Sequence, residues 1–130
     1  MMMTRAAAVL YLGLTLVVVC FQLALAAGAP WGEYAMGGAV PGRYPPALRA
    51  TAFLQGALLA WFGAVVWARA GMFRLRFAPP AAILLVVIVC GFSLAANLAT
   101  PSAGERLIWA PVAAGLFISS LVVWATTRRR

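Results

Sequence analysis

Two glutamates are the only acidic residues of this 130-residue chain, and each lies close in sequence to arginine. Glu33 precedes Arg43 and Arg49 in one polar stretch, and Glu105 is followed directly by Arg106 in another. Carboxylates and guanidinium groups placed in this way could pair with one another or bind a charged ligand. They could also serve acid–base chemistry on a lipid phosphate.

The sequence lacks the side chains that usually bind metals or carry out redox chemistry. Histidine is absent, and Cys20 and Cys90 form no CxxC pair, so we expect no metal and no cofactor. We interpret both cysteines as small packing residues that stay reduced. They lie in different apolar segments at unequal depths, whereas a disulfide needs Cα atoms within about 7 Å.

The chain around these residues is too apolar to face water. It is 65% hydrophobic and only 9% charged, with a mean hydropathy of +1.00. Apolar runs of about 18 residues or more can cross a bilayer, and in lipid only a helix satisfies its own backbone within one segment. The sequence therefore predicts an all-α integral membrane four-helix bundle in one domain. Its expected helices are 6–27, 50–68, 81–98 and 107–126.

Residues 6–27 follow an arginine and end in small residues, as a secretory leader does. Their length favours a retained transmembrane helix.

Ten arginines, and no lysine, give the chain a net charge of +8. Seven of them flank the predicted helices on one side: Arg5, Arg69, Arg74, Arg76, Arg128, Arg129 and Arg130. The other three lie on the opposite side, so the positive-inside rule places both termini in the cytoplasm and the long first loop outside. The arginine-for-lysine and alanine bias suggests a bacterial inner membrane. Basic ends without a soluble fold do not indicate nucleic-acid binding.

Polar side chains gather near the outer ends of the predicted helices. Gln22, Gln55 and Asn97 fall within about two turns of that end, counted at 1.5 Å per residue. Polar groups at membrane depth usually face the bundle interior. With the charged loop residues and two tryptophans, they form our candidate binding site: Gln22, Trp31, Glu33, Arg43, Arg49, Gln55, Asn97, Glu105, Arg106 and Trp109. We expect both glutamates to pair with the outer arginines.

The first outer loop is rich in turn residues, with GG at 37–38, PG at 41–42 and PP at 45–46. Its aromatic residues could anchor it at the headgroup level, or the loop could form a lid across the outer mouth of the bundle. In the second outer loop, Thr100 or Ser102 could cap the fourth helix, and Ser102 with Glu105 has capping-box spacing.

The motifs AGAPWG…GG…PG…R and N..TPS..ER..W.PV resemble a group of small, uncharacterised bacterial four-helix membrane proteins. The resemblance implies a fold and a location and no activity. The matching positions are Trp31, Gly32, Gly37, Gly38, Pro41, Gly42, Asn97, Thr100, Pro101, Ser102, Glu105, Arg106, Trp109, Pro111 and Val112.

Three classes of function remain open. The favoured one is a non-enzymatic binding protein whose outer polar site holds a small molecule, a lipid headgroup or a partner protein. The alternative is a small oligomeric permease, and an enzyme acting at the membrane surface has the least motif support. The expected partners are the lipid bilayer and either a second copy of the chain or another membrane protein.

The arginine distribution predicts that residue 39 is reached from outside the cell. In a variant without Cys20 and Cys90, Ala39→Cys should react with an impermeant maleimide in intact cells. Reaction only after permeabilisation would show the opposite orientation.

Overall fold

A computed structural model describes residues 1–74 and 79–129, so Arg76 and Arg130 of the arginine pattern lie outside the described residues. Four α-helices make up most of it: α1 (Met2–Ala27), α2 (Pro46–Arg69), α3 (Ala82–Ala99) and α4 (Ala103–Thr127). Two short 3-10 helices, η1 (Gly32–Tyr34) and η2 (Met36–Gly38), lie between α1 and α2. All four α-helices are long and apolar enough to cross a membrane. The fold is thus all-α and suited to a small multi-pass membrane protein.

Three helices begin four residues before the predicted starts, at Met2, Pro46 and Ala103. The hydropathy pattern missed these first turns because they contain polar or charged residues. Pro46 occupies the start of α2, where its missing N–H costs no helical hydrogen bond. Ser102 caps α4 by accepting a hydrogen bond from the Glu105 amide at 3.2 Å, which selects Ser102 over Thr100 as the cap.

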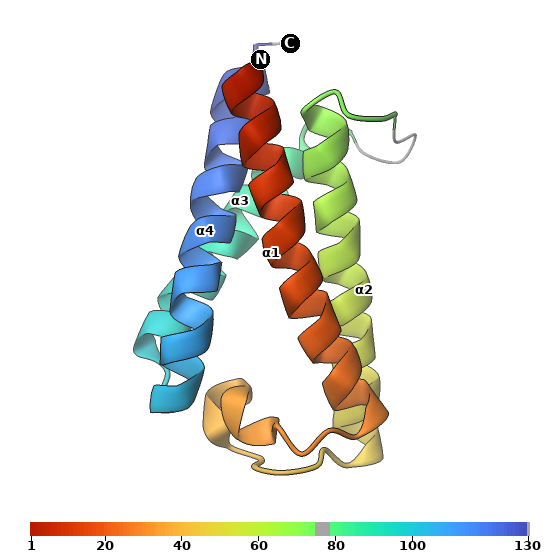
Figure 1. The fold of residues 1–130 in the computed structure, drawn as a ribbon, viewed down its shortest axis with the longest axis vertical. Coiled ribbons are helices and arrows are strands. Elements are labelled where there is room, and N and C mark those ends of the chain that lie inside the picture. The colour runs from red at the N-terminus through yellow and green to blue at the C-terminus, as the bar shows by residue number, and fades with distance from the viewer. Residues whose placement is uncertain (75–78, 130) are drawn as a thin grey trace.

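The helices form two hairpins, α1 with α2 and α3 with α4, and α1 also packs along α4 (Figure 1). By contrast, α2 and α3 make few contacts with each other. Both termini lie at one end of the bundle, which we call the terminal end, and the α1–α2 connection lies at the other, the loop end (Figure 1). The hairpins lie together at the terminal end and diverge toward the loop end (Figure 1).

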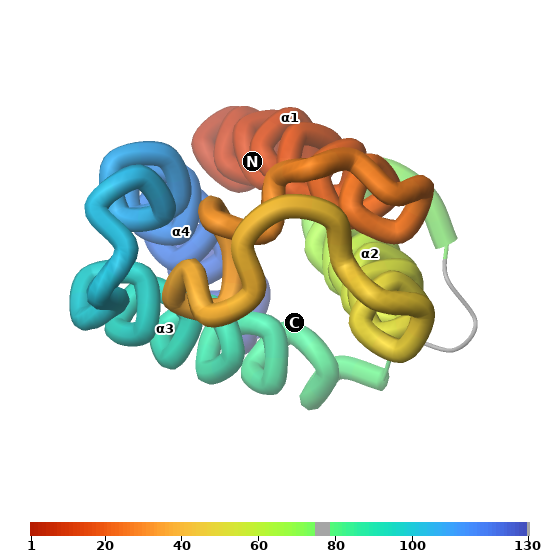
Figure 2. The backbone as a smooth tube through the Cα atoms, turned by 90° about the horizontal axis from the view of Figure 1, so that it is seen from below, coloured from red at the N-terminus to blue at the C-terminus, as the bar shows by residue number. Residues whose placement is uncertain are grey.

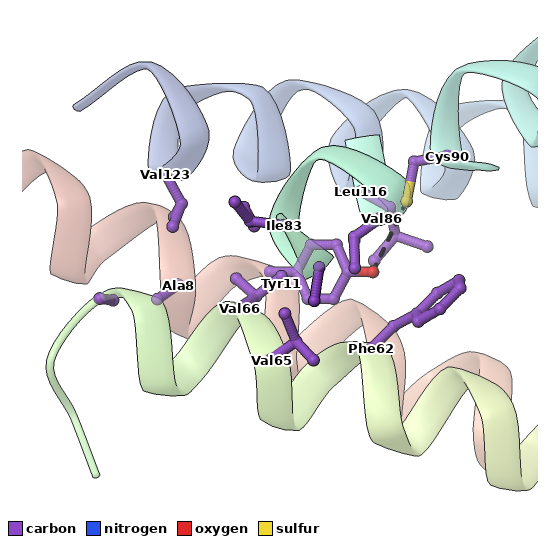
Figure 3. Close-up of a cluster of buried hydrophobic side chains, with 12 residues drawn as sticks. Ala8, Tyr11, Phe62, Val65, Val66, Ile83, Val86, Cys90, Leu116 and Val123 are labelled. Carbon is purple, nitrogen blue, oxygen red and sulfur yellow. Dashed lines mark hydrogen bonds between the residues drawn. The ribbon is translucent and has the colours of Figure 1, made fainter. Parts of the chain in front are cut away.

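The main core fills the half of the bundle nearer the terminal end. Val65, Val66, Val86 and Val123 are completely buried there. Tyr11 projects from α1 into the centre of this core, and its hydroxyl lies 3.5 Å from the Cys90 sulfur (Figure 3). This hydrogen bond satisfies a phenol that would otherwise lie unpaired among apolar side chains.

Both cysteines are free, as predicted. Cys90 is buried, as a packing residue should be, whereas Cys20 is exposed on the surface of the bundle, so its interpretation as a packing residue is wrong.

Small residues let the helices approach closely within the chain. A Cβ atom on Gly56 would lie 3.4 Å from the Gln22 Cβ, and one on Gly91 would lie 3.3 Å from the Phe117 ring. These glycines therefore face α1 and α4, whereas Ala60 is exposed. The spacing of small residues is compatible with contact inside the bundle or with another subunit. In the structure, Gly56 and Gly91 make contacts inside the bundle.

Gly63 marks the tightest α1–α2 approach in the core. A Cβ there would lie 3.2 Å from Thr15 Cγ2. We expect Gly63→Leu to lower the free energy of unfolding by about 1–3 kcal/mol through overpacking. The matched control is Gly13→Leu, because Gly13 is an exposed helical glycine with no neighbouring atom within 4 Å of its added Cβ. Unfolding in mixed detergent micelles measures both, and equal stability of the two variants would contradict the assigned packing.

Candidate functional site

A cavity of about 390 Å³ lies between the diverging hairpins. Side chains of all four helices line it, and Tyr34, Ala35, Met36 and Tyr44 line it from the α1–α2 connection. A second cavity of about 80 Å³ shares seven of its lining residues and continues toward Tyr11 and Cys90. Beyond that point the buried core closes the bundle. The size falls within the range of small-molecule sites, about 300–1,000 Å³.

Five of the ten predicted site residues line the larger cavity: Gln22, Gln55, Asn97, Glu105 and Trp109. They come from four different helices, so the tertiary fold gathers them. The other five do not line it: Trp31, Glu33, Arg43, Arg49 and Arg106. Four of the five cavity-lining residues lie within the predicted apolar helix segments. The fifth, Glu105, lies in the first turn of α4.

The connection between α1 and α2, residues 28–45, forms a lid over the loop end. Figure 2, seen from that end, shows it leaving α1, reaching toward α3 and α4, and returning to α2. Gly32 fixes its shape, because its amide donates to the Gly42 carbonyl at 2.9 Å. Any Cβ on Gly32 would lie 2.0 Å from the Val40 carbonyl oxygen, so no larger residue fits.

Three hydrogen bonds fasten this lid to the second hairpin. The Gly37 amide donates to Glu105 Oε2 at 2.8 Å, and Trp109 Nε1 donates to the Tyr34 carbonyl at 2.9 Å. Ser102 Oγ donates to the Glu33 carbonyl at 2.9 Å. Gly37 can present its amide in this way because it has a left-handed φ of 69°. The lid is therefore part of the first hairpin by chain connection and is hydrogen-bonded to the second.

Glu105 is the central acceptor of this contact. Its Oε2 also accepts from Thr100 Oγ1 at 2.7 Å, while Thr100 itself is buried. The carboxylate lies in the first turn of α4, where the helix dipole favours negative charge. Within the described part of the chain, Oε1 has no hydrogen-bond donor.

The arginines of the loop end bond to backbone carbonyls, which corrects the predicted ion pairs. Arg49 Nε donates to the Ala26 carbonyl at 2.8 Å, and Arg106 Nη2 donates to the Thr100 carbonyl at 2.9 Å. The Arg43 guanidinium lies against Gly28. Carbonyls at helix C-termini lack intrahelical donors and compete for guanidinium groups. The prediction paired arginines with glutamates because their charges are opposite. It did not consider the backbone carbonyls, which are the acceptors of Arg49 and Arg106.

Aromatic rings join the lid to both hairpins. Phe21 of α1 lies with its ring centroid 4.6 Å from that of Trp109 in α4, and 6.2 Å from that of Trp31 with nearly parallel planes. Trp31 is 45% exposed, whereas Tyr44 is only 4% exposed. Tyr44 packs with Leu25 and Ala52, so it belongs to a small core beneath the lid. This arrangement supports the lid interpretation over simple headgroup anchors for Tyr34 and Tyr44.

Tyr44 carries the one side-chain hydroxyl in the described residues that is buried without a hydrogen-bond partner. Burial, and after it the nearby Glu105 carboxylate, raises the pKa of this phenol, so it keeps its proton. A buried unpaired hydroxyl costs free energy, and a residue that lines a cavity can recover it from a bound group.

Sequence reasoning missed four polar contributors to the cavity: Tyr34, Tyr44, Thr51 and Ser93. Thr51 and Gln55 stand four residues apart on α2, as do Ser93 and Asn97 on α3. Asn97 Nδ2 donates to the Ser93 carbonyl at 2.8 Å. This i, i+4 spacing is visible in the sequence. It could have added Thr51 to the predicted Gln55 and Ser93 to the predicted Asn97, since such pairs share one helix face.

Fold and cavity together describe a small helical multi-pass membrane protein with a capped internal site. No protein-family model, curated protein or solved structure matches the chain. The resemblance carried by the WG and TPS..ER motifs therefore stays a prediction.

The lid contact predicts a local effect of Glu105. Glu105→Ala removes the acceptor of the Gly37 amide, so hydrogen exchange at Gly37 should speed up by roughly ten- to a hundredfold, since a hydrogen bond to a charged group contributes about 1.5–3 kcal/mol. Glu105→Gln keeps an acceptor oxygen and should have a smaller effect.

Glu33→Ala is the matched control, because Glu33 is exposed and its backbone carbonyl still accepts from Ser102. Exchange detected by mass spectrometry in detergent would measure all three variants. Equal protection of residues 28–45 in Glu105→Ala and wild type would show that the carboxylate does not hold the lid.

Proposed function

We propose that the protein is a non-enzymatic binding protein of the membrane that holds one amphiphilic molecule in the capped cavity. The observation that carries this proposal is the division of the cavity by chemistry. Its polar members, among them Glu105 and Asn97, lie toward the loop end beside apolar residues such as Leu25, and side chains such as Leu59, Phe62 and Val89 line the part nearer the core. A polar head and an apolar tail fit that gradient.

Access from the side supports the proposal. Thr51, Gln55, Leu58 and Ser93 line the cavity and are exposed, and they belong to α2 and α3, the two neighbouring helices that make few contacts. In a bilayer such an opening faces lipid, so an amphiphile can pass into the cavity without crossing water. The lid covers the end that faces the headgroups or water.

The closed core disfavours the permease that the sequence left open. Val65, Val86 and Val123 are fully buried between the cavity and the terminal end, so apolar side chains separate the two. The proposed orientation, with the lid outside the cytoplasm of a bacterial cell, rests on the arginine distribution alone. A second copy of the chain is not needed to complete the cavity.

Photolabelling tests whether the cavity is occupied. A neutral single-chain glucoside with a diazirine at the middle of its tail should label cavity residues on α2 and α3, read out as modified peptides. Ser93→Phe places a ring at the lateral opening and should reduce that labelling by about tenfold, because a filled site excludes the tail. Ala96→Phe is the matched control: Ala96 is exposed on the same helix and does not line the cavity.

Equal labelling of both variants, confined to outward residues such as Phe92, would show that the probe only coats the bundle. Net passage of the glucoside across proteoliposomes containing the protein would establish transport in place of simple binding.

A further inference from the structure

We infer that the head group held at the loop end is a primary ammonium, bound between Glu105 Oε1 and the Tyr44 hydroxyl. This inference rests on the proposed binding function and names the chemical class of its ligand. It uses two groups that are left incompletely satisfied on the same cavity wall.

The charge of the cavity favours a cation. Glu105 is the only charged residue among the described residues that line it. Its two known donors, the Gly37 amide and the Thr100 hydroxyl, are both neutral and both bind Oε2. A carboxylate beside a lipid-facing cavity is costly unless it finds a counter-charge, and Oε1 is the oxygen that remains for one.

Anionic heads lack a positively charged partner inside the cavity. None of the arginines in the described part of the chain lines it, although the chain carries a strong positive charge. The guanidinium groups of Arg49 and Arg106 already donate to carbonyls, and that of Arg43 lies against Gly28. A phosphate or sulfate in the cavity would meet the Glu105 carboxylate, and like charges repel.

Tyr44 distinguishes a primary ammonium from a quaternary one. Its side chain lines the cavity, is 4% exposed, and has a hydroxyl with no partner. Once the ring turns to face the head, that hydroxyl can accept a hydrogen bond from an N–H group while the carboxylate accepts another. A trimethylammonium head has positive charge and no N–H donor, so it can satisfy Glu105 by charge alone and leaves Tyr44 unpaired.

Competition against the photoreactive glucoside tests the inference. Four competitors with identical dodecyl tails carry a primary ammonium, a trimethylammonium, a neutral glucoside and a sulfate head. The primary ammonium should compete best and the sulfate worst. Glu105→Gln should weaken both cations by roughly tenfold more than it weakens the glucoside, as loss of a charge-assisted contact predicts.

Tyr44→Phe should weaken the primary ammonium by several-fold and spare the trimethylammonium. Glu33→Gln, which changes a carboxylate outside the cavity, should alter neither. Glucoside labelling that persists in Glu105→Gln shows that the cavity is still formed in that variant.

The outcomes separate the two proposals. If the glucoside labels the cavity but the four heads compete equally, or the sulfate competes best, the ammonium assignment is wrong and the binding function stands. If the glucoside fails to label the cavity in wild-type protein, the binding function itself is wrong.

Discussion

The four helices are pinned together over one half of their length, and the rest of the structure follows from that constraint. At the terminal end, Val65, Val66, Val86 and Val123 meet with no exposed surface, around the Tyr11 side chain. Interiors packed this densely tolerate few voids, so the hairpins cannot slide there. Toward the loop end the same hairpins diverge, and a cavity opens between them.

The lid compensates for this divergence. It forms hydrogen bonds to α4, beside the point where the Phe21 ring of α1 contacts the Trp109 ring of α4. Because these contacts end on Glu105 and Trp109, which also line the cavity, the lid and the site share their atoms. A group that bound at Glu105 would therefore also act on the lid.

How much of the site the sequence predicted depends on where each residue lies. Gln22, Gln55 and Asn97 were found because a polar side chain inside an apolar helix turns toward the bundle interior, and all three line the cavity. Glu33, Arg43 and Arg49 lie in or beside the lid, where no periodicity fixes direction, and they do not line it. Charge alone suggested their pairing, while the backbone carbonyls that bind Arg49 and Arg106 leave no trace in the sequence.

The sequence by itself determined the number and type of the spanning elements, because hydrocarbon permits only self-satisfied helices and each run is long enough to cross it. It also marked the start of α4, since Thr100 and Ser102 are both cap residues read within a few positions, and the structure selected Ser102. Only the tertiary structure decided that α2 and α3 stay apart, that Gly37 reaches Glu105, and that the Tyr44 hydroxyl is buried without a partner. Each of these depends on segments distant in the chain, whose meeting is set by packing geometry and not by local pattern.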